Sequence, residues 1–207
     1  MKKTDAIIKV AGLVKNSFVD WPGYIASVVF LGGCNIRCYY CHNHNILCAT
    51  SNSIPWVEVL EQIKERVGFI DGVVISGGEP ALHPNLLDII QDIKSLNLLV
   101  KLDTNGTNSS LLQDVIEKKL VDFIAMDIKA PFTKLKAIIG TDKFNDEIKK
   151  SIEILKSQKN IPFMFRVTPC PELTFEDFEE INALAGGFGF KKNYFTEVNN
   201  ADIIPEV

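Results

Sequence analysis

Residues 27–41 read Ser27-Val-Val-Phe-Leu31-Gly-Gly-Cys34-Asn-Ile-Arg-Cys38-Tyr-Tyr-Cys41. The run Ser27–Leu31 is apolar and rich in β-branched and aromatic residues, which predicts a buried strand. Two glycines end the run, and a loop with three cysteines in eight residues follows. The stretch therefore predicts a strand that leads directly into a thiol-rich loop.

Apolar, β-rich runs recur along the rest of the chain and alternate with helical patterns. Further strands are predicted at Gly72–Ser76, Leu98–Asp103, Asp122–Asp127, Pro162–Thr168 and Tyr194–Val198. Between the strands, apolar residues recur about every 3.6 residues, in the stripes Trp56, Leu60, Ile63, Val67; Leu86, Ile89, Ile90, Ile93; and Phe144, Ile148, Ile152, Leu155. Two pairs with capping-box spacing predict helix starts, namely Ser110 with Gln113 and Thr174 with Asp177.

Strand–helix alternation of this kind implies parallel strands joined by right-handed helical crossovers. Six such units are too few for a closed eight-stranded barrel, but they suit a curved and incomplete one. The predicted fold is therefore α/β, a partial, open (β/α)6 TIM-like barrel of parallel strands. No repeat or linker divides the sequence, so residues 1–207 are expected to form a single domain. In barrels of this kind, functional residues gather where strands end and loops begin.

Composition narrows the possible classes of function. Of the 207 residues, 46% are hydrophobic and 23% are charged, and the net charge of −4 includes no basic cluster. A nucleic-acid binder would need a basic face, and no stretch approaches the roughly 18 apolar residues of a membrane span. Residues 1–11 lack the apolar core of a signal peptide. A cytoplasmic location is expected, where cysteines are more often metal ligands or catalysts than disulfides.

The three clustered thiols, at spacing C-x3-C-x2-C, suit an iron–sulfur cluster. Thiolates ligate the irons of such clusters, and most clusters take four of them. Ligation by Cys34, Cys38 and Cys41 alone would leave one iron of a cubane open to an outside ligand. A zinc site is the rival interpretation, because these cysteines and His42 would supply the four ligands that zinc prefers.

Other cysteines and histidines are interpreted without a ligand role. Cys48 and Cys170 stand apart from the cluster in the sequence, and two scattered thiols cannot hold a second cubane. Both are expected to be free cysteines. His44 and His83 are interpreted as a loop residue and a helix-start residue.

The cysteine spacing, with the aromatic Tyr40 before the third cysteine, resembles that of the radical S-adenosylmethionine enzymes. The resemblance implies the partial (β/α)6 barrel on grounds independent of the alternation above. It also implies a 4Fe–4S cluster on the three cysteines, whose open iron chelates the amino and carboxylate groups of S-adenosylmethionine. An electron from that cluster breaks a sulfonium C–S bond and gives methionine and a 5′-deoxyadenosyl radical.

The segment Ser76-Gly77-Gly78-Glu79-Pro80 ends the next predicted strand. Its glycines permit close approach of the backbone to a ligand, and Glu79 can accept hydrogen bonds from an ammonium group. Alone, the segment would be equally well explained as a strand-to-helix turn. Beside the cysteine loop, it looks like the family's segment that holds the methionine amino group of the cofactor.

Two more predicted strands end in Asp103-Thr104-Asn105-Gly106 and in Asp127-Ile128-Lys129. Without the cysteine loop, these residues would be interpreted as a turn and as exposed strand ends. The resemblance implies that Asp103 and Asp127 lie near the ribose and methionine ends of the cofactor, where some members bind a monovalent cation. It also implies that Lys129 pairs with the cofactor carboxylate and that Arg166 contacts the cofactor. Burial of either aspartate without a partner would be costly.

The segment before the cysteine loop resembles one branch of this family. Phe18-Val-Asp20-Trp21-Pro22-Gly23-Tyr24, together with Cys41-His42-Asn43, is similar to glycyl-radical-enzyme activating proteins, above all the anaerobic ribonucleoside-triphosphate reductase activating group. Pyruvate formate-lyase activating enzymes have Asp-Gly-Pro-Gly-Ile-Arg in this place, and the chain lacks that arginine. The resemblance thins after Arg166, at Thr168-Pro169-Cys170-Pro171.

This resemblance implies a glycyl radical enzyme as partner, with anaerobic ribonucleotide reductase favoured, and an electron donor such as flavodoxin or ferredoxin. No nucleic-acid or membrane partner is expected. The alternatives are an activase of pyruvate formate-lyase or another glycyl radical enzyme, a radical enzyme that acts on a small molecule or RNA, and a zinc-binding structural module.

Overall fold

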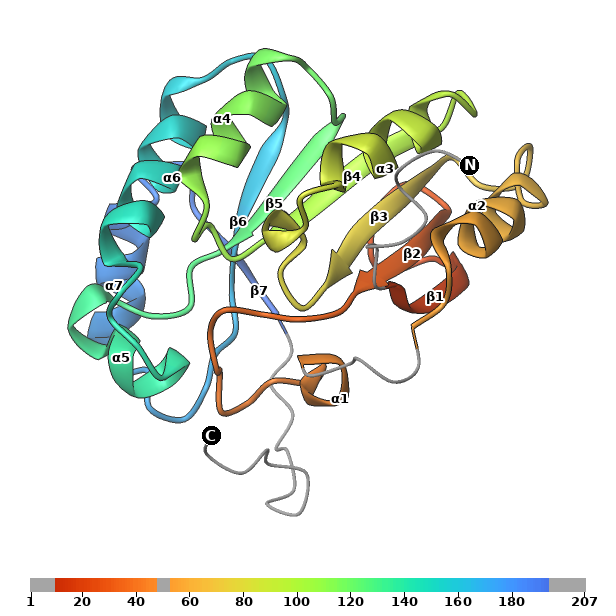
Figure 1. Cartoon of the computed structure of the whole chain (residues 1–207). Coiled ribbons are helices and arrows are strands. Elements are labelled where there is room, and N and C mark those ends of the chain that lie inside the picture. Colours follow the sequence, from red (N-terminus) through yellow and green to blue (C-terminus); the bar gives the residue numbers. More distant parts are fainter. Residues whose placement is uncertain (1–9, 48–52, 194–207) are drawn as a thin grey trace.

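The computed structural model describes residues 10–47 and 53–193. A single seven-stranded sheet, with the strands in sequence order from β1 to β7, runs through this part of the molecule (Figure 1). β2 to β7 pair in parallel, whereas β1 pairs antiparallel with β2. The strands are β1 (Val10–Ser17), β2 (Ala26–Leu31), β3 (Gly72–Gly77), β4 (Leu99–Thr104), β5 (Phe123–Asp127), β6 (Phe163–Val167) and β7 (Lys191–Lys192).

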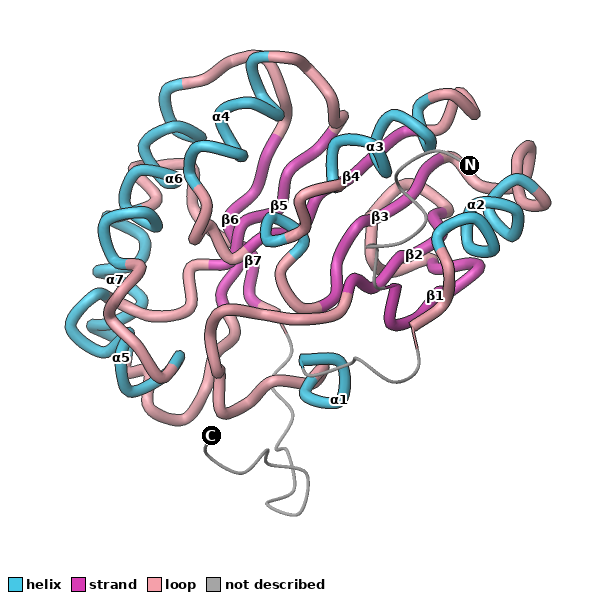
Figure 2. Tube along the Cα trace, in the orientation of Figure 1, coloured by secondary structure: helices cyan, strands magenta, loops and turns pink. Residues whose placement is uncertain are grey.

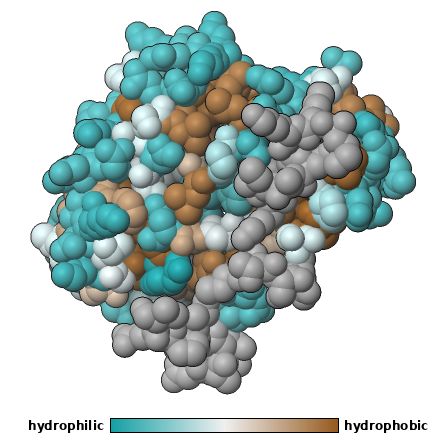
Figure 3. All heavy atoms as spheres, viewed as in Figure 1, coloured by the Kyte–Doolittle hydropathy of each residue, from teal (hydrophilic) through white to brown (hydrophobic). Residues whose placement is uncertain are grey.

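Helices connect the parallel strands, and all of them except α1 pack on one face of the sheet (Figure 2). They are α1 (His44–Leu47), α2 (Trp56–Lys64), η1 (Pro80–Leu82), α3 (Leu86–Lys94), α4 (Ser109–Glu117), α5 (Phe132–Ile139), α6 (Asn145–Ser157) and α7 (Phe175–Leu184). Hydrophilic side chains cover much of this helical surface (Figure 3). Within the two described ranges, no helix has both the length and the apolar character needed to cross a membrane.

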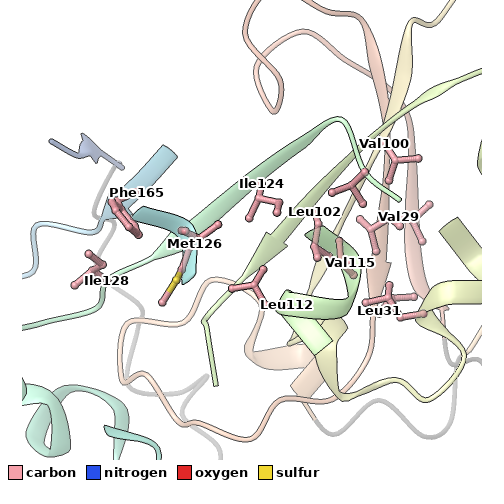
Figure 4. Close-up of a cluster of buried hydrophobic side chains, with 14 of the residues drawn as sticks. Val29, Leu31, Val100, Leu102, Leu112, Val115, Ile124, Met126, Ile128 and Phe165 are labelled. Carbon is pink, nitrogen blue, oxygen red and sulfur yellow. The ribbon is translucent and has the colours of Figure 1, made fainter. Parts of the chain in front are cut away.

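Successive residues of each strand point to opposite faces of the sheet, and each face carries its own apolar cluster. Val29, Val100 and Ile124 point toward the helices, where Leu112 and Val115 of α4 meet them in the main core (Figure 4). The residues between them in each strand point to the opposite, inner face of the sheet. Because both faces are covered, these strands read as continuous apolar runs rather than as alternating ones.

The inner face carries a smaller cluster around Trp21, which is 4% exposed and packs with Ala26, Val28 and Val74. Trp21 belongs to the turn between β1 and β2, residues 18–25. A Cβ on Gly72, at the start of β3, would lie 2.9 Å from the Trp21 ring. The turn therefore covers the inner face near the N-terminal ends of the parallel strands, at the end opposite the cysteine loop.

The predicted open, mostly parallel α/β fold is confirmed, because within the described residues β1 and β7 form the two edges of the sheet. The antiparallel β1 was not predicted from the sequence. The sixth parallel strand is β7, and the predicted strand at Tyr194–Val198 lies outside the described residues, as does Cys48. Val67 was placed in a helical stripe, but α2 ends before it and its side chain is 49% exposed.

Of the two predicted capping boxes, one is confirmed and one is wrong. Thr174 caps α7, and both reciprocal hydrogen bonds with Asp177 are present. α4 instead begins at Ser109, and the side chain of Asn108 accepts a hydrogen bond from the Leu111 N–H at 3.1 Å. Asparagine is at least as good an N-cap as serine, so Asn108 competes successfully with Ser110 for this position.

Candidate active site

The C-terminal ends of the parallel strands and the cysteine loop surround a cavity of about 380 Å³. Ligand pockets in proteins commonly measure roughly 300–1,000 Å³. All the residues predicted as ligands or cofactor contacts line this one cavity, although they come from five separate segments. They are Cys34, Cys38, Tyr40, Cys41, Gly77, Gly78, Glu79, Pro80, Asp103, Thr104, Asn105, Asp127, Lys129 and Arg166. Their roles toward a cofactor stay predictions.

Backbone hydrogen bonds hold the cysteine loop on both sides. The Gly33 N–H donates to the Ile46 carbonyl in α1 at 2.9 Å, and the Arg37 N–H donates to the Ile139 carbonyl at the end of α5, also at 2.9 Å. The Arg37 guanidinium reaches back to the Cys34 carbonyl at 2.7 Å. The loop is therefore positioned by neighbouring elements, with its three thiols toward the cavity.

The Cys34 and Cys38 thiols are in an environment that favours their protonated form. Burial raises the pKa of Cys34, and it raises the pKa of Cys38 to about 12 although the Lys129 ammonium opposes this rise. Iron binds the thiolate, so loading of the loop must release protons. Cys170 is buried and does not line the cavity.

The donor set fits a cubane held by three protein ligands. Within the described residues, no group of three or more His, Cys, Asp or Glu side chains converges on a point that would hold a single metal ion. A cubane does not require such convergence, because each thiolate binds a different iron. The side chain of Asn105 also donates to Cys34 Sγ at 3.8 Å, so the loop after β4 already contacts one ligand.

The Glu79 carboxylate joins the end of β3 to the end of β4. Its Oε1 accepts hydrogen bonds from the Ala81 N–H at 3.0 Å and the Thr104 hydroxyl at 2.8 Å, and its Oε2 accepts one from the Asn105 N–H at 2.6 Å. The side chain is 1% exposed. Burial raises the pKa of Glu79 to about 7, although these hydrogen bonds lower it. The predicted contact with a cofactor ammonium stays a prediction, because the observed partners lie within the chain.

We expect Glu79→Gln to weaken both the fold and the binding of S-adenosylmethionine. The new amide would turn an N–H toward at least one of the three donors, and loss of a hydrogen bond to a buried charged group costs about 1.5–3 kcal/mol. Thermal unfolding and calorimetric titration of the cofactor would measure the two losses. Glu180→Gln, an exposed position in α7, is the matched control. Unchanged unfolding and affinity in Glu79→Gln would contradict this bridging role.

Charged side chains form one ion-pair network at the ends of β4, β5 and β6. Arg166 Nε donates to Asp127 at 2.8 Å, and its Nη1 donates to Asp103 at 3.0 Å. Lys129 Nζ donates to the second oxygen of Asp127 at 2.9 Å. Burial alone would raise the pKa of Asp127, but Arg166 and Lys129 hold it well below its usual range. The cost expected for unpaired burial of the aspartates is thus offset within the chain.

The sequence reasoning missed two contacts of the site. Lys101 is 2% exposed, lies on the inner face of β4, and pairs with Asp103 at 2.7 Å. A lysine inside an otherwise apolar strand was the available signal. The Tyr39 hydroxyl of the cysteine loop donates to Glu172, just after Cys170. The segment where the resemblance thins therefore packs against the cysteine loop.

Comparison with known proteins agrees with this geometry. The family model described as the radical SAM superfamily matches residues 28–185. A Methanocaldococcus jannaschii protein that carries the name of a glycyl-radical enzyme activating enzyme is 35% identical over 83% of this chain and 73% of its own length. The pyruvate formate-lyase-activating enzyme of Clostridium pasteurianum is 31% identical over 70% of this chain and 63% of its own length.

Among solved structures, the fold is similar to that of SuiB from Streptococcus suis, determined with the precursor peptide SuiA. The TM-score is 0.65, with 16% identity over 87% of this chain and 42% of SuiB. This likeness concerns the fold alone.

Proposed function

Because this chain belongs to the radical SAM superfamily, whose members use a 4Fe–4S cluster and S-adenosylmethionine, we propose that it activates a glycyl radical enzyme. The observation that carries the proposal is its 35% identity, over 83% of the chain, to the M. jannaschii protein named for that activity. The C. pasteurianum activating enzyme supports the same class of reaction.

In this proposal, Cys34, Cys38 and Cys41 hold three irons of the cubane, and the fourth iron is free for the cofactor. The backbone of Gly77 and Gly78 forms part of the cavity wall, and the absence of side chains lets this wall pack against the backbone of Leu31 and Gly33. The amino group of S-adenosylmethionine would lie on this wall, with its carboxylate toward Lys129 and its ribose toward Asp103. Tyr40 and Pro80 provide apolar surface beside these polar positions.

When bound, the cluster and cofactor supply reductive C–S cleavage coupled to removal of a hydrogen atom from the substrate, which yields methionine, 5′-deoxyadenosine and a carbon radical. The residues of this chain hold the cofactor and the substrate in position and keep water out of the cavity. Trp21, Val28 and Val74 fill the inner face of the sheet with apolar side chains. The substrate itself must seal the end of the cavity that lies away from this apolar cluster, since water there would compete with the reaction.

A glycine in a loop of a partner protein suits this arrangement. Glycine has no side chain to obstruct approach to its Cα, and a loop is narrow enough to enter between the two edges of the sheet. The described sheet has two unpaired edges, β1 and β7, so the barrel is open between them. A peptide segment can therefore approach the cavity without unfolding the barrel.

Within this class we favour anaerobic ribonucleoside-triphosphate reductase as the partner, with flavodoxin or ferredoxin as electron donor. Support comes from the Asp20-Trp21-Pro22-Gly23-Tyr24 segment, which lacks the arginine of the pyruvate formate-lyase activating group. Trp21 is buried in the inner cluster, and the Tyr24 ring lies 4.8 Å from the Trp21 ring, measured between centroids. Pyruvate formate-lyase is the second candidate, because its activating enzyme is a relative at 31% identity.

The test is to mix reduced, cluster-loaded protein and S-adenosylmethionine with each candidate partner in the absence of oxygen. We expect electron paramagnetic resonance to show a glycyl radical on the reductase, with 5′-deoxyadenosine formed alongside it. A reductase with the target glycine replaced by alanine is the matched control and should give no radical.

A radical on pyruvate formate-lyase alone would change the partner but keep the class of activity. Efficient cofactor cleavage with no radical on either partner would contradict the activase proposal and favour a small-molecule substrate. Absence of cleavage with a fully loaded cluster would contradict the chemistry itself.

A further inference from the structure

Lys101 pairs with Asp103, one of the two aspartates near which the family resemblance implies a monovalent cation. Lys101 belongs to β4 and is 2% exposed. Its Nζ lies 2.7 Å from Asp103 Oδ1 and 2.8 Å from the Asp20 carbonyl oxygen. Both contacts are to oxygen, the element that alkali and alkaline-earth cations prefer as ligand.

The remaining oxygens of the Asp103 and Asp127 carboxylates also have cationic partners. Asp103 Oδ2 accepts a hydrogen bond from Arg166 at 3.0 Å. The two oxygens of Asp127 accept hydrogen bonds from Arg166 at 2.8 Å and from Lys129 at 2.9 Å. With Lys101, three protein cations therefore surround two carboxylates. A metal cation beside these oxygens would have to share them with a buried ammonium or guanidinium, and repulsion between two like charges in a buried site is strongly unfavourable.

These residues do not fit an additional monovalent cation. We propose that the Lys101 ammonium replaces this cation. The lysine fixes the Asp103 carboxylate, so cofactor binding in the cavity does not depend on sodium or potassium. Lys101 is then a positioning residue, which acts on the cofactor through Asp103. The inference rests on the family's cofactor and not on the identity of the partner protein.

The same lysine connects the site to the turn between β1 and β2. Its second contact, the Asp20 carbonyl, immediately precedes Trp21, the residue at the centre of the inner cluster. Removal of the ammonium would leave two oxygens facing a space of the size of an ammonium group. Potassium is similar in size to ammonium, so this space should accept potassium once the lysine is gone.

The experiment compares wild type, Lys101→Met and Lys94→Met in potassium chloride and in choline chloride of equal ionic strength. Lys94 is the matched control, because it pairs with Asp122 at 2.8 Å outside the cavity. The first measurement is the unfolding temperature of the cluster-free protein, and the second is the affinity of the cluster-loaded protein for S-adenosylmethionine.

We expect wild type and Lys94→Met to behave alike in both salts. Lys101→Met should bind the cofactor roughly tenfold or more weakly in choline, the effect of losing one charged hydrogen-bond donor. Potassium should restore most of that affinity. It should also raise the unfolding temperature of Lys101→Met by roughly 2–4 °C, through binding to the folded state only.

The proposal would be overturned if the cofactor affinity or the unfolding temperature of wild type depends on potassium. It would also be overturned if Lys101→Met folds and potassium changes neither quantity in it. If Lys101→Met folds in neither salt, Lys101→Arg is used in its place. This variant keeps the positive charge, so its cofactor affinity and unfolding temperature should not depend on potassium. A potassium dependence in Lys101→Arg would overturn the proposal. A wild type that binds no S-adenosylmethionine in either salt contradicts the proposed function instead, and the unfolding measurement still tests the lysine.

Discussion

Alanine at any one of Cys34, Cys38 and Cys41 is expected to abolish the cluster, whereas Cys170→Ala should retain it. A cubane on three cysteines already lacks one protein ligand, so the loss of a second leaves too few thiolates to hold it. Cys170 is buried away from the cavity and cannot substitute for a lost ligand. Iron and sulfide analysis after anaerobic reconstitution would measure the effect, with about four irons per chain expected for wild type.

The fold should survive these cysteine replacements. The three side chains are only partly buried, and the loop that carries them is held by backbone hydrogen bonds such as Arg37 N–H to the Ile139 carbonyl. The unfolding temperature of the cluster-free variants should therefore stay close to that of the cluster-free wild type. Stoichiometric zinc after anaerobic reconstitution, or full iron content in any of the three variants, would refute the assignment of the ligands.

Much of the architecture could be predicted because the central strands are buried on both faces. β3, β4 and β5 therefore appear as apolar runs, and their predicted bounds differ from the observed ones by at most one residue at either end. β1 was not predicted because it lies at an edge. Six of its eight residues, Lys15 among them, are exposed or partly exposed, and Gly12 interrupts its apolar pattern. Strand propensity is weak evidence at an edge, where packing covers one side only.

The candidate site could be located because parallel strands end at one edge of the sheet. Asp103 and Asp127 each end a predicted strand and Gly77 directly follows one, so the topology alone brings them together. The partners of these side chains could not be predicted in the same way. Whether Glu79 faces a ligand or the Asn105 backbone depends on loop conformation, and the sequence pattern does not contain that information.

Lys101 was missed for a related reason. A charged residue within a predicted strand is usually placed on an exposed face, yet the inner face of this sheet is closed by Trp21. The lysine is buried because a turn about 80 residues earlier supplies a carbonyl oxygen, at Asp20, for its ammonium. Long-range backbone contacts of this kind leave no periodic signal in the sequence.

Gly78→Ala is expected to disrupt the site more severely than any single polar replacement in it. A Cβ on Gly78 would lie 1.9 Å from the Gly33 carbonyl oxygen and 2.5 Å from its carbonyl carbon. These are backbone atoms, and the same carbonyl accepts the Glu79 N–H at 2.8 Å. Relief of the clash must therefore separate the end of β3 from the glycines that lead into the cysteine loop. Overpacking of this kind costs about 1–3 kcal/mol or more.

We expect Gly78→Ala to unfold at a temperature lower by roughly 4–10 °C, given about 2–4 °C per kcal/mol for a chain of this size. Cofactor affinity should fall by at least about a hundredfold, because the wall and the cysteine loop move apart. Gly12→Ala is the matched control, since a Cβ there meets no atom within 4 Å. That replacement should be neutral or slightly stabilising, by about 0.4–1 kcal/mol, through its effect on the unfolded chain. Equal behaviour of the two variants would show that contact between Gly78 and Gly33 does not position the site. The position of the cysteine loop would then depend on its hydrogen bonds to neighbouring segments, those to α1 and α5 among them.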